Sequence, residues 1–148
     1  MSSYTQILYH IVFATKGRRR VLDKPRRDDL FRYLWGVIKN HNCHLYRIGG
    51  VEDHVHILSS LHPSVALADF VKDLKVASSK WVKDERSFPK FEAWQEGYAA
   101  LTCSWAERDG LIEYIKEQEE HHRTVPFLDE YREMLRKSGM ELDERFLP

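Results

Sequence analysis

Two pairs of side chains have the types and spacing for chemistry on a phosphodiester: His54 and His56, and, much later in the chain, Tyr114 and Gln118. The histidines are two residues apart in an apolar run, residues 51–61, that is typical of a β-strand, so both rings should project from one face of a sheet. Tyr114 and Gln118 are four apart in a segment with helical periodicity, so they should share one helix face. A helix packed on that sheet would bring all four side chains together.

The histidine pair is suited to holding a divalent metal. Two imidazoles cannot fill the shell of such an ion, so the other positions must come from another side chain, water or substrate, which leaves a catalytic opening. Gln118 could offer its amide oxygen as a third ligand, and a phosphodiester oxygen could complete the set and be polarised. With only neutral protein ligands we expect weak, exchangeable binding. Histidine favours Mn²⁺, Co²⁺ or Zn²⁺, whereas Mg²⁺ is the most available ion.

Tyr114 is the expected nucleophile. A phenol has a pKa near about 10 and can be activated by a nearby metal or base. Attack on a phosphodiester would give a phosphotyrosine ester, which a free 3′-hydroxyl could later displace. Cleavage and rejoining would then need no ATP, in agreement with the absence of a Walker loop from the sequence.

Each of these residues also has a structural interpretation. A His-x-His pair in a strand can be purely structural, and Tyr114 could pack against the sheet. His121 and His122 could be alternative ligands, proton carriers or favourable charges near a helix C-terminus. For His10, on the first strand, packing or hydrogen bonding is favoured over metal ligation.

The formal net charge of zero conceals an uneven distribution. Residues 1–106 carry 16 Lys and Arg against 11 Asp and Glu, whereas residues 107–148 carry 7 against 12. Basic patches attract phosphates, although each patch alone could be a solvated surface. The residues expected to contact nucleic acid lie in the segment 16–27 and on a later helix: Lys16, Arg18, Arg19, Arg20, Lys72, Lys75 and Lys80.

Hydrophobic periodicity predicts four strands and four helices. The expected order is strand 6–15, helix 25–40, strand 43–48, strand 51–61, helix 63–82, strand 97–105, helix 106–122 and helix 126–137, with a turn at Gly49-Gly50 and a loosely held tail after Gly139. This βαββαβ order followed by two helices predicts an α+β, ferredoxin-like antiparallel sheet with additional C-terminal helices. We expect one domain over residues 1–148, with a core at about 4–127 and a C-terminal helix and tail at 126–148.

The composition excludes several other classes of protein. The sequence contains no apolar run of the roughly 20 residues that a membrane span needs, and its N-terminus lacks the layout of a signal peptide. Its two cysteines form no Cys-x-x-Cys pair, so neither a disulfide framework nor a structural zinc site is indicated. A cytoplasmic protein is expected.

Together these motifs resemble the single-tyrosine HUH transposases of small bacterial insertion sequences, a family that includes the REP-associated tyrosine transposases. The resemblance extends over most of residues 4–127. Its blocks are YHIVFATK at residues 9–16, DHVH at 53–56, K-x-x-SSK at 75–80, GY at 97–98 and YI-x-x-QEEHH at 114–122. Several blocks in the right order are far more specific than any one of them.

The resemblance implies a homodimeric, nucleoid-associated enzyme that cuts and rejoins single-stranded DNA at hairpin-forming element ends. His54, His56 and Gln118 would hold Mg²⁺ or Mn²⁺, and Tyr114 would form a 5′-phosphotyrosine. In such proteins the catalytic helix can complete the site of the other subunit. Trp81 and Trp94 could stack on extruded bases or pack in the core.

Two other functions remain open from the residues. One is a ferredoxin-like module, or a domesticated transposase, that binds nucleic acid without chemistry, although RNA-recognition domains of that fold use exposed strand aromatics where this chain has histidines. The other is a metal-dependent hydrolase that uses water. It would keep its activity when Tyr114 is replaced by Phe.

Overall fold

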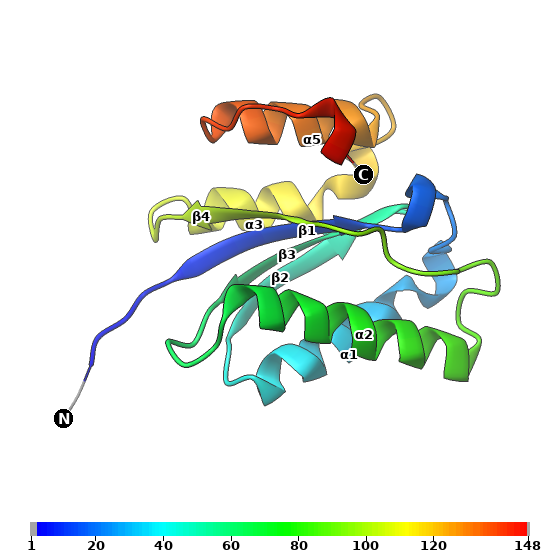
Figure 1. The fold of residues 1–148 in the computed structure, drawn as a ribbon, viewed down its shortest axis with the longest axis horizontal. Coiled ribbons are helices and arrows are strands. Elements are labelled where there is room, and N and C mark those ends of the chain that lie inside the picture. The colour runs from blue at the N-terminus through cyan, green and yellow to red at the C-terminus, as the bar shows by residue number, and fades with distance from the viewer. Residues whose placement is uncertain (1–2, 148) are drawn as a thin grey trace.

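A four-stranded antiparallel sheet forms the centre of the molecule, in a computed structural model that describes residues 3–147 (Figure 1). Its strands lie in the order β2-β3-β1-β4, and every neighbouring pair is antiparallel. Their bounds are β1 (Leu8–Ala14), β2 (Leu45–Gly50), β3 (His54–Ser60) and β4 (Ala99–Cys103). The predicted ferredoxin-like βαββαβ fold is therefore confirmed.

Helices cover both faces of the sheet (Figure 1). One face carries α1 (Lys24–Asn40) and α2 (Leu67–Glu85), and the other carries α3 (Arg108–Lys116), α4 (Gln118–His121) and α5 (Phe127–Lys137). Short 3₁₀ turns follow β1, as η1 (Lys16–Arg18), and α5, as η2 (Glu144–Phe146). The additional C-terminal helices are confirmed. Within residues 3–147, no helix is both long enough and apolar enough to cross a membrane.

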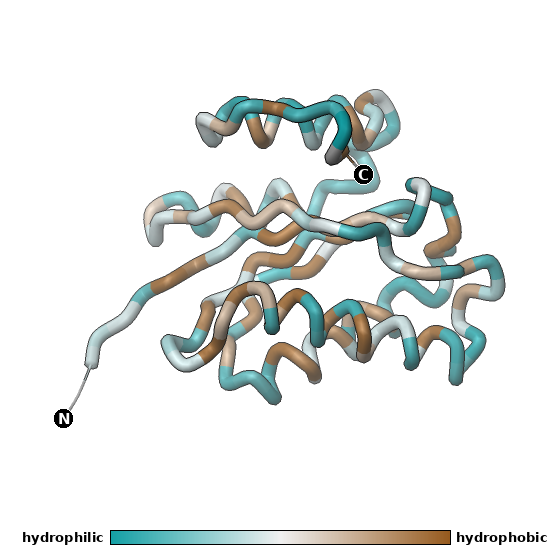
Figure 2. Tube along the Cα trace, viewed as in Figure 1, coloured by the Kyte–Doolittle hydropathy of each residue, from teal (hydrophilic) through white to brown (hydrophobic). Residues whose placement is uncertain are grey.

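The main core lies between the sheet and the α1/α2 layer. Hydrophobic residues recur at helical spacing in both helices, as the brown positions among teal ones in Figure 2 show. In α1 the buried stripe is Leu30, Leu34 and Ile38, and it meets Ile11 and Ile57 of the central strands. Pro25 in the first turn of α1 favours the start of this helix, as predicted.

The opposite face of the two central strands carries the histidines. Because side chains alternate along a strand, His54 and His56 of β3 point to the same face, away from α1 and α2. The antiparallel register places them opposite Ala14 and Val12 of β1. Both rings are completely buried under the C-terminal helices. This part of the prediction from spacing is confirmed.

The predicted turn at Gly49-Gly50 is wrong. Both glycines are the last residues of β2, where they pair with His56 and Val55, and the chain turns at residues 51–53 instead. A side chain at position 49 would collide with α3, because an added Cβ would lie 2.3 Å from the Ile115 carbonyl oxygen. Gly49 therefore serves a close approach between a strand and a helix, not a turn.

Replacing Gly49 with Ala is expected to destabilise the protein by about 1–3 kcal/mol, because α3 must move off the sheet to admit the methyl group. The measurement is chemical denaturation. Gly110→Ala, within α3 itself, is the matched control, since nothing lies within 4 Å of its added Cβ. Alanine there should stabilise the helix by up to about 1 kcal/mol. Equal stabilities for the two variants would contradict the assignment of Gly49 to helix packing.

Two other expectations need correction. The single helix predicted at 106–122 is divided at Glu117, whose backbone leaves helical geometry (φ −96°, ψ 20°) between α3 and α4. The tail after Gly139 is less loosely held than expected. It contains η2, Arg132 forms an ion pair with Glu144 at 3.1 Å, and Leu147 packs against the cluster that contains Phe127.

Candidate active site

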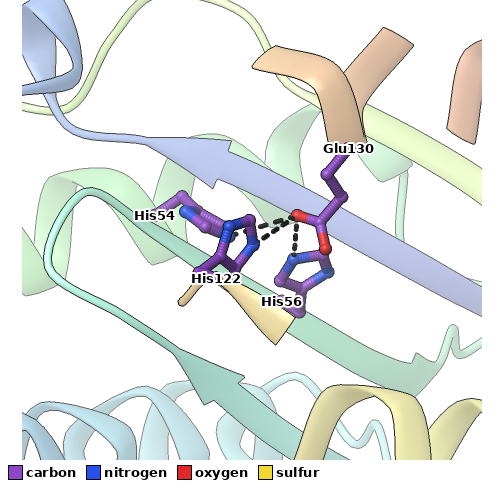
Figure 3. Close-up of side chains that lie close together, drawn as sticks. All are labelled: His54, His56, His122 and Glu130. Atoms are coloured by element: carbon purple, nitrogen blue, oxygen red, sulfur yellow. Dashed lines mark hydrogen bonds and ion pairs between the residues drawn. The ribbon is translucent and has the colours of Figure 1, made fainter. Parts of the chain in front are cut away.

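The carboxylate of Glu130, on α5, is the centre of a buried cluster that contains the predicted site residues. Its oxygen Oε1 lies 3.0 Å from His56 Nε2, 3.0 Å from His122 Nε2 and 3.3 Å from His54 Nε2. Figure 3 shows the three rings converging on this oxygen from one side. The Glu130 side chain is only 2% exposed, so its charge is compensated by protein groups and not by water.

The second carboxylate oxygen of Glu130 binds the residues of α3 and α4. The Tyr114 hydroxyl donates a hydrogen bond to Oε2, and the Gln118 amide nitrogen donates another at 3.0 Å. His121 Nε2 lies 3.2 Å from the same oxygen. Despite the break at Glu117, Tyr114 and Gln118 therefore still face the histidine pair, as their spacing predicted.

Outer partners fix the orientation of the three convergent imidazoles. His54 Nδ1 lies 2.7 Å from an Asp53 carboxylate oxygen, and His122 Nδ1 donates to the Val125 carbonyl at 2.6 Å. His56 Nδ1 lies 2.8 Å from His10 Nε2, which confirms that His10 is a hydrogen-bonding residue. With Nδ1 occupied outside, each ring presents Nε2 to the cluster, which is the usual arrangement of histidines that bind metal.

Burial and neighbouring charges set the protonation of these rings. Burial lowers the pKa of His56 to about 4, and burial together with His56 lowers the pKa of His10 to about 3, so both rings are neutral near pH 7. Burial also acts to lower the pKa of His54, but hydrogen bonds to Asp53 and Glu130 outweigh it and raise this pKa. Neutral imidazole is the form in which histidine binds a metal ion.

The pKa values of the two acidic groups of the cluster, Glu130 and Tyr114, are shifted in opposite directions. Burial acts to raise the pKa of Glu130, but hydrogen bonds to His122, His54 and His56 hold that pKa far below its usual range. Burial and the hydrogen bond to Glu130 raise the pKa of the Tyr114 phenol. Tyr114 is therefore a neutral phenol whose proton already has a carboxylate acceptor.

The predicted metal ligands fit a divalent ion in this arrangement. The Nε2 atoms of His54 and His56 face the same point, and the Gln118 amide oxygen lies 3.1 Å from His54 Nε2. Nitrogen and neutral oxygen donors of this kind suit Mn²⁺ and related ions. His122, considered an accessory residue, belongs to the same cluster, whereas His121 meets only the far oxygen of Glu130.

Glu130 is the residue of this cluster that reasoning from the sequence missed. One signal could have identified it. The apolar stripe of α5 contains Phe127, Tyr131 and Met134, and Glu130 falls within that stripe, where a solvated acid is not expected. A single acid among the buried positions of an amphipathic helix indicates a partner of positive charge or a metal.

The predicted DNA-contacting residues lie outside the Glu130 cluster. Lys16 and Arg19 form exposed ion pairs with Glu92, and Lys75 donates to the backbone carbonyls of Gln95 and Gly97 at 2.8 and 2.6 Å. Lys72, Lys75 and Lys80 belong to α2, on the other side of the sheet from Tyr114, and Lys80 pairs with Asp84. Arg18 and Arg20 belong to the segment that follows β1.

The two tryptophans considered for base stacking contribute to packing. Trp94 is buried in the main core and donates to the Ser78 hydroxyl at 2.9 Å. Trp81 is partly buried against that core, with its ring 5.2 Å from the ring of Tyr33. The core role is therefore the observed one for both.

Comparison with known proteins identifies transposases as relatives of this chain. Residues 3–118 match the family described as IS200-like transposase. The ISDra2 transposase TnpA of Deinococcus radiodurans is 30% identical over 120 residues, which cover 76% of this chain and 84% of that protein. The transposase for insertion sequence element IS200 of Salmonella typhimurium is 28% identical over 120 residues, with 78% of each chain covered.

Solved structures of two proteins also superpose on this chain. A crystal structure of a Deinococcus radiodurans protein described as a transposase superposes with a TM-score of 0.62 at 29% identity, covering 80% of this chain and 95% of that one. A REP-associated tyrosine transposase bound to a REP hairpin superposes with a TM-score of 0.60, covering 84% of this chain and 76% of that one. At 14% identity, the second likeness concerns the fold alone.

Proposed function

The chain belongs to the IS200-like transposase family, and we propose that it cleaves and rejoins single-stranded DNA at insertion-sequence ends through a 5′-phosphotyrosine intermediate. One observation carries this mechanism: the Tyr114 hydroxyl lies in the same buried cluster as the convergent Nε2 atoms of His54 and His56. A nucleophile, a base and a set of metal donors are thus combined in one place.

In this mechanism the Tyr114 oxygen attacks the scissile phosphorus while its proton passes to Oε2 of Glu130. The new bond joins the phenolic oxygen to phosphorus, and the bond from phosphorus to the 3′ oxygen breaks. The 3′ oxygen leaves with the electron pair and takes a proton from water, and Glu130 returns the Tyr114 proton to solvent. Rejoining reverses these steps with a 3′-hydroxyl as the attacking group, so the phosphoester bond is conserved throughout.

A divalent ion, Mg²⁺ or Mn²⁺, held by His54, His56 and Gln118 would supply Lewis-acid polarisation of the phosphate when bound. Gln118 also donates to Glu130 at 3.0 Å, which keeps the carboxylate turned toward Tyr114. The ring of Phe127 stacks on His54 at 4.0 Å between centroids and so excludes water from one side of the pair.

The DNA path is proposed to begin at the basic segment beside the His54 end of the sheet. The backbone amide of Thr15, directly before η1, donates to the Asp53 carbonyl at 2.9 Å, so Lys16, Arg18, Arg19 and Arg20 follow a residue bonded to the neighbour of His54. We propose that Lys72, Lys75 and Lys80 contact more distant parts of the DNA across α2. Of the two surfaces, the η1 segment is the better placed for the reacting strand.

A hairpin substrate and a homodimer are also part of the proposal. Support for the hairpin comes from the structural neighbour that is bound to a REP hairpin. Support for the dimer comes from the resemblance to single-tyrosine transposases. Within residues 3–147, Tyr114 contacts Glu130 in the cluster that holds His54 and His56 of the same chain.

The test uses 3′-labelled single-stranded DNA that contains a hairpin from the sequence flanking the encoding gene. The protein is incubated with this DNA and Mn²⁺, or with a chelator, and the products are separated on a denaturing gel. A labelled protein adduct that requires Mn²⁺ is the expected result, because a 5′-phosphotyrosine retains the 3′ fragment. Cleavage without an adduct would favour a water-using nuclease, and binding without cleavage would favour a module without chemistry.

A further inference from the structure

We propose that His122 and Glu130 are additional ligands of the metal, so that this chain builds a centre of three imidazoles, one carboxylate and the Gln118 amide. This inference rests on the metal dependence in the proposed function, and it adds two protein ligands to the metal site. Gln118 remains a ligand in this assignment. The new ligands come from the residue after α4 and from α5, and both lie beyond the segment 3–118 that matches the family.

The separations of the four donor atoms carry the proposal. The ligand atoms of His54, His56, His122 and Glu130 all lie within 4.8 Å of one another (Figure 3). Ligands about 2.1 Å from a shared ion are at most about 4.2 Å apart, so shifts well under 1 Å would allow all four to bind one ion.

The surroundings of His122 match those of His54 and His56. Its Nδ1 donates to the Val125 carbonyl, so the ring presents Nε2 to the cluster. Its ring packs edge-on against His54, with centroids 4.6 Å apart. His121 differs, since its Nε2 lies beside the other carboxylate oxygen, Oε2, next to the Tyr114 hydroxyl. The structure therefore selects His122, not His121, from the adjacent pair.

The charge of the cluster also favours a metal at this place. Glu130 is a buried carboxylate faced by imidazoles and by no Lys or Arg among the ion pairs of the described chain. A divalent cation among these donors would place a full positive charge beside the buried carboxylate.

A carboxylate and a third imidazole change the expected metal preference. Three neutral ligands would bind any ion weakly, whereas an anionic ligand adds direct charge attraction. Imidazole-rich sites favour Mn²⁺, Co²⁺ or Zn²⁺ over Mg²⁺, because Mg²⁺ prefers oxygen donors and retains its waters. We therefore expect Mn²⁺ to bind at least about tenfold more tightly than Mg²⁺.

The test measures Mn²⁺ binding by titration calorimetry in the absence of DNA. Glu130→Gln should raise the Kd for Mn²⁺ by about 10- to 100-fold. Glu133→Gln is the matched control, because Glu133 lies one turn further along α5 and pairs with Arg136 and Lys137. It should stay within about twofold of wild type. An unchanged Kd for Glu130→Gln would reject Glu130 as a ligand.

A second measurement uses the wild-type protein, so it does not depend on whether a variant folds. Pulsed electron paramagnetic resonance of the Mn²⁺-loaded protein counts the imidazole nitrogens bound to the ion. Three nitrogens are expected, and two would reject His122. The variant His56→Ala distinguishes a failure of the proposed metal site from a failure of the added ligands. If this variant binds Mn²⁺ like wild type, the metal site of the proposed function fails, whereas loss in His56→Ala but not in Glu130→Gln rejects only the added ligand.

Discussion

Replacing Tyr114 with Phe is expected to abolish the covalent protein–DNA adduct and to lower strand cleavage by at least about 1,000-fold. The change removes one oxygen, the atom that would bond to phosphorus. The fold of the variant should persist, because Gln118 and His121 still contact the Glu130 oxygen that no longer accepts from position 114. A large loss of activity with a small loss of stability is the signature of a nucleophile.

The measurement is the denaturing gel with 3′-labelled hairpin DNA and Mn²⁺, combined with thermal denaturation of each variant. Tyr46→Phe is the control, because Tyr46 packs partly buried in the same hydrophobic cluster as Tyr114. This variant should form the adduct at the wild-type rate. Adduct formation by the Tyr114 variant would reject this residue as the nucleophile. Persistent cleavage without any adduct would instead assign the attack to water.

Replacing His56 with Ala is expected to reduce Mn²⁺-dependent cleavage by at least about 100-fold while DNA affinity stays within about threefold of wild type. The ring is completely buried, and its Nε2 faces the cluster at 3.0 Å from Glu130. DNA affinity should persist because phosphate contacts are distributed over the basic surfaces, away from this ring. This variant should therefore lose metal-dependent cleavage but keep DNA binding.

Cleavage and fluorescence-anisotropy binding are measured on the same preparation of the His56 variant. His62→Ala, at an exposed histidine two residues beyond β3, is the control and should match wild type in both assays. Undiminished cleavage by His56→Ala would reject the metal assignment. Loss of DNA binding together with cleavage would indicate that the ring supports the fold or contacts DNA directly.

The sequence was sufficient to predict the βαββαβ order of the elements along the chain and the shared face of the histidines. Both follow from local rules, since alternation places His54 and His56 together whatever the rest of the chain does. Tyr114 and Gln118 were also correctly predicted to face them. That result survives the break at Glu117, because Gln118, the first residue of α4, still reaches the Glu130 carboxylate.

Features that depend on contacts between distant segments could not be predicted in the same way. Two consecutive glycines usually favour a turn, and only the position of Ile115 on the sheet explains why Gly49 lies inside a strand. Glu130 is one acid among several on an amphipathic helix. Helical periodicity places it on the buried face, but its partners depend on which turn of α5 lies over β3, and periodicity does not determine that.

The contact between Gly49 and Ile115 has an entropic consequence for the nucleophile. Because the main chain of Gly49 packs directly against the backbone of Ile115, the residue directly before Ile115 is held close to the sheet. Tyr114 then retains only the two torsions of its own side chain, and its hydrogen bond to Glu130 restricts these as well. The Tyr114 side chain is therefore ordered when the protein folds. Bringing the phenol and the phosphate together when DNA binds then costs little further entropy.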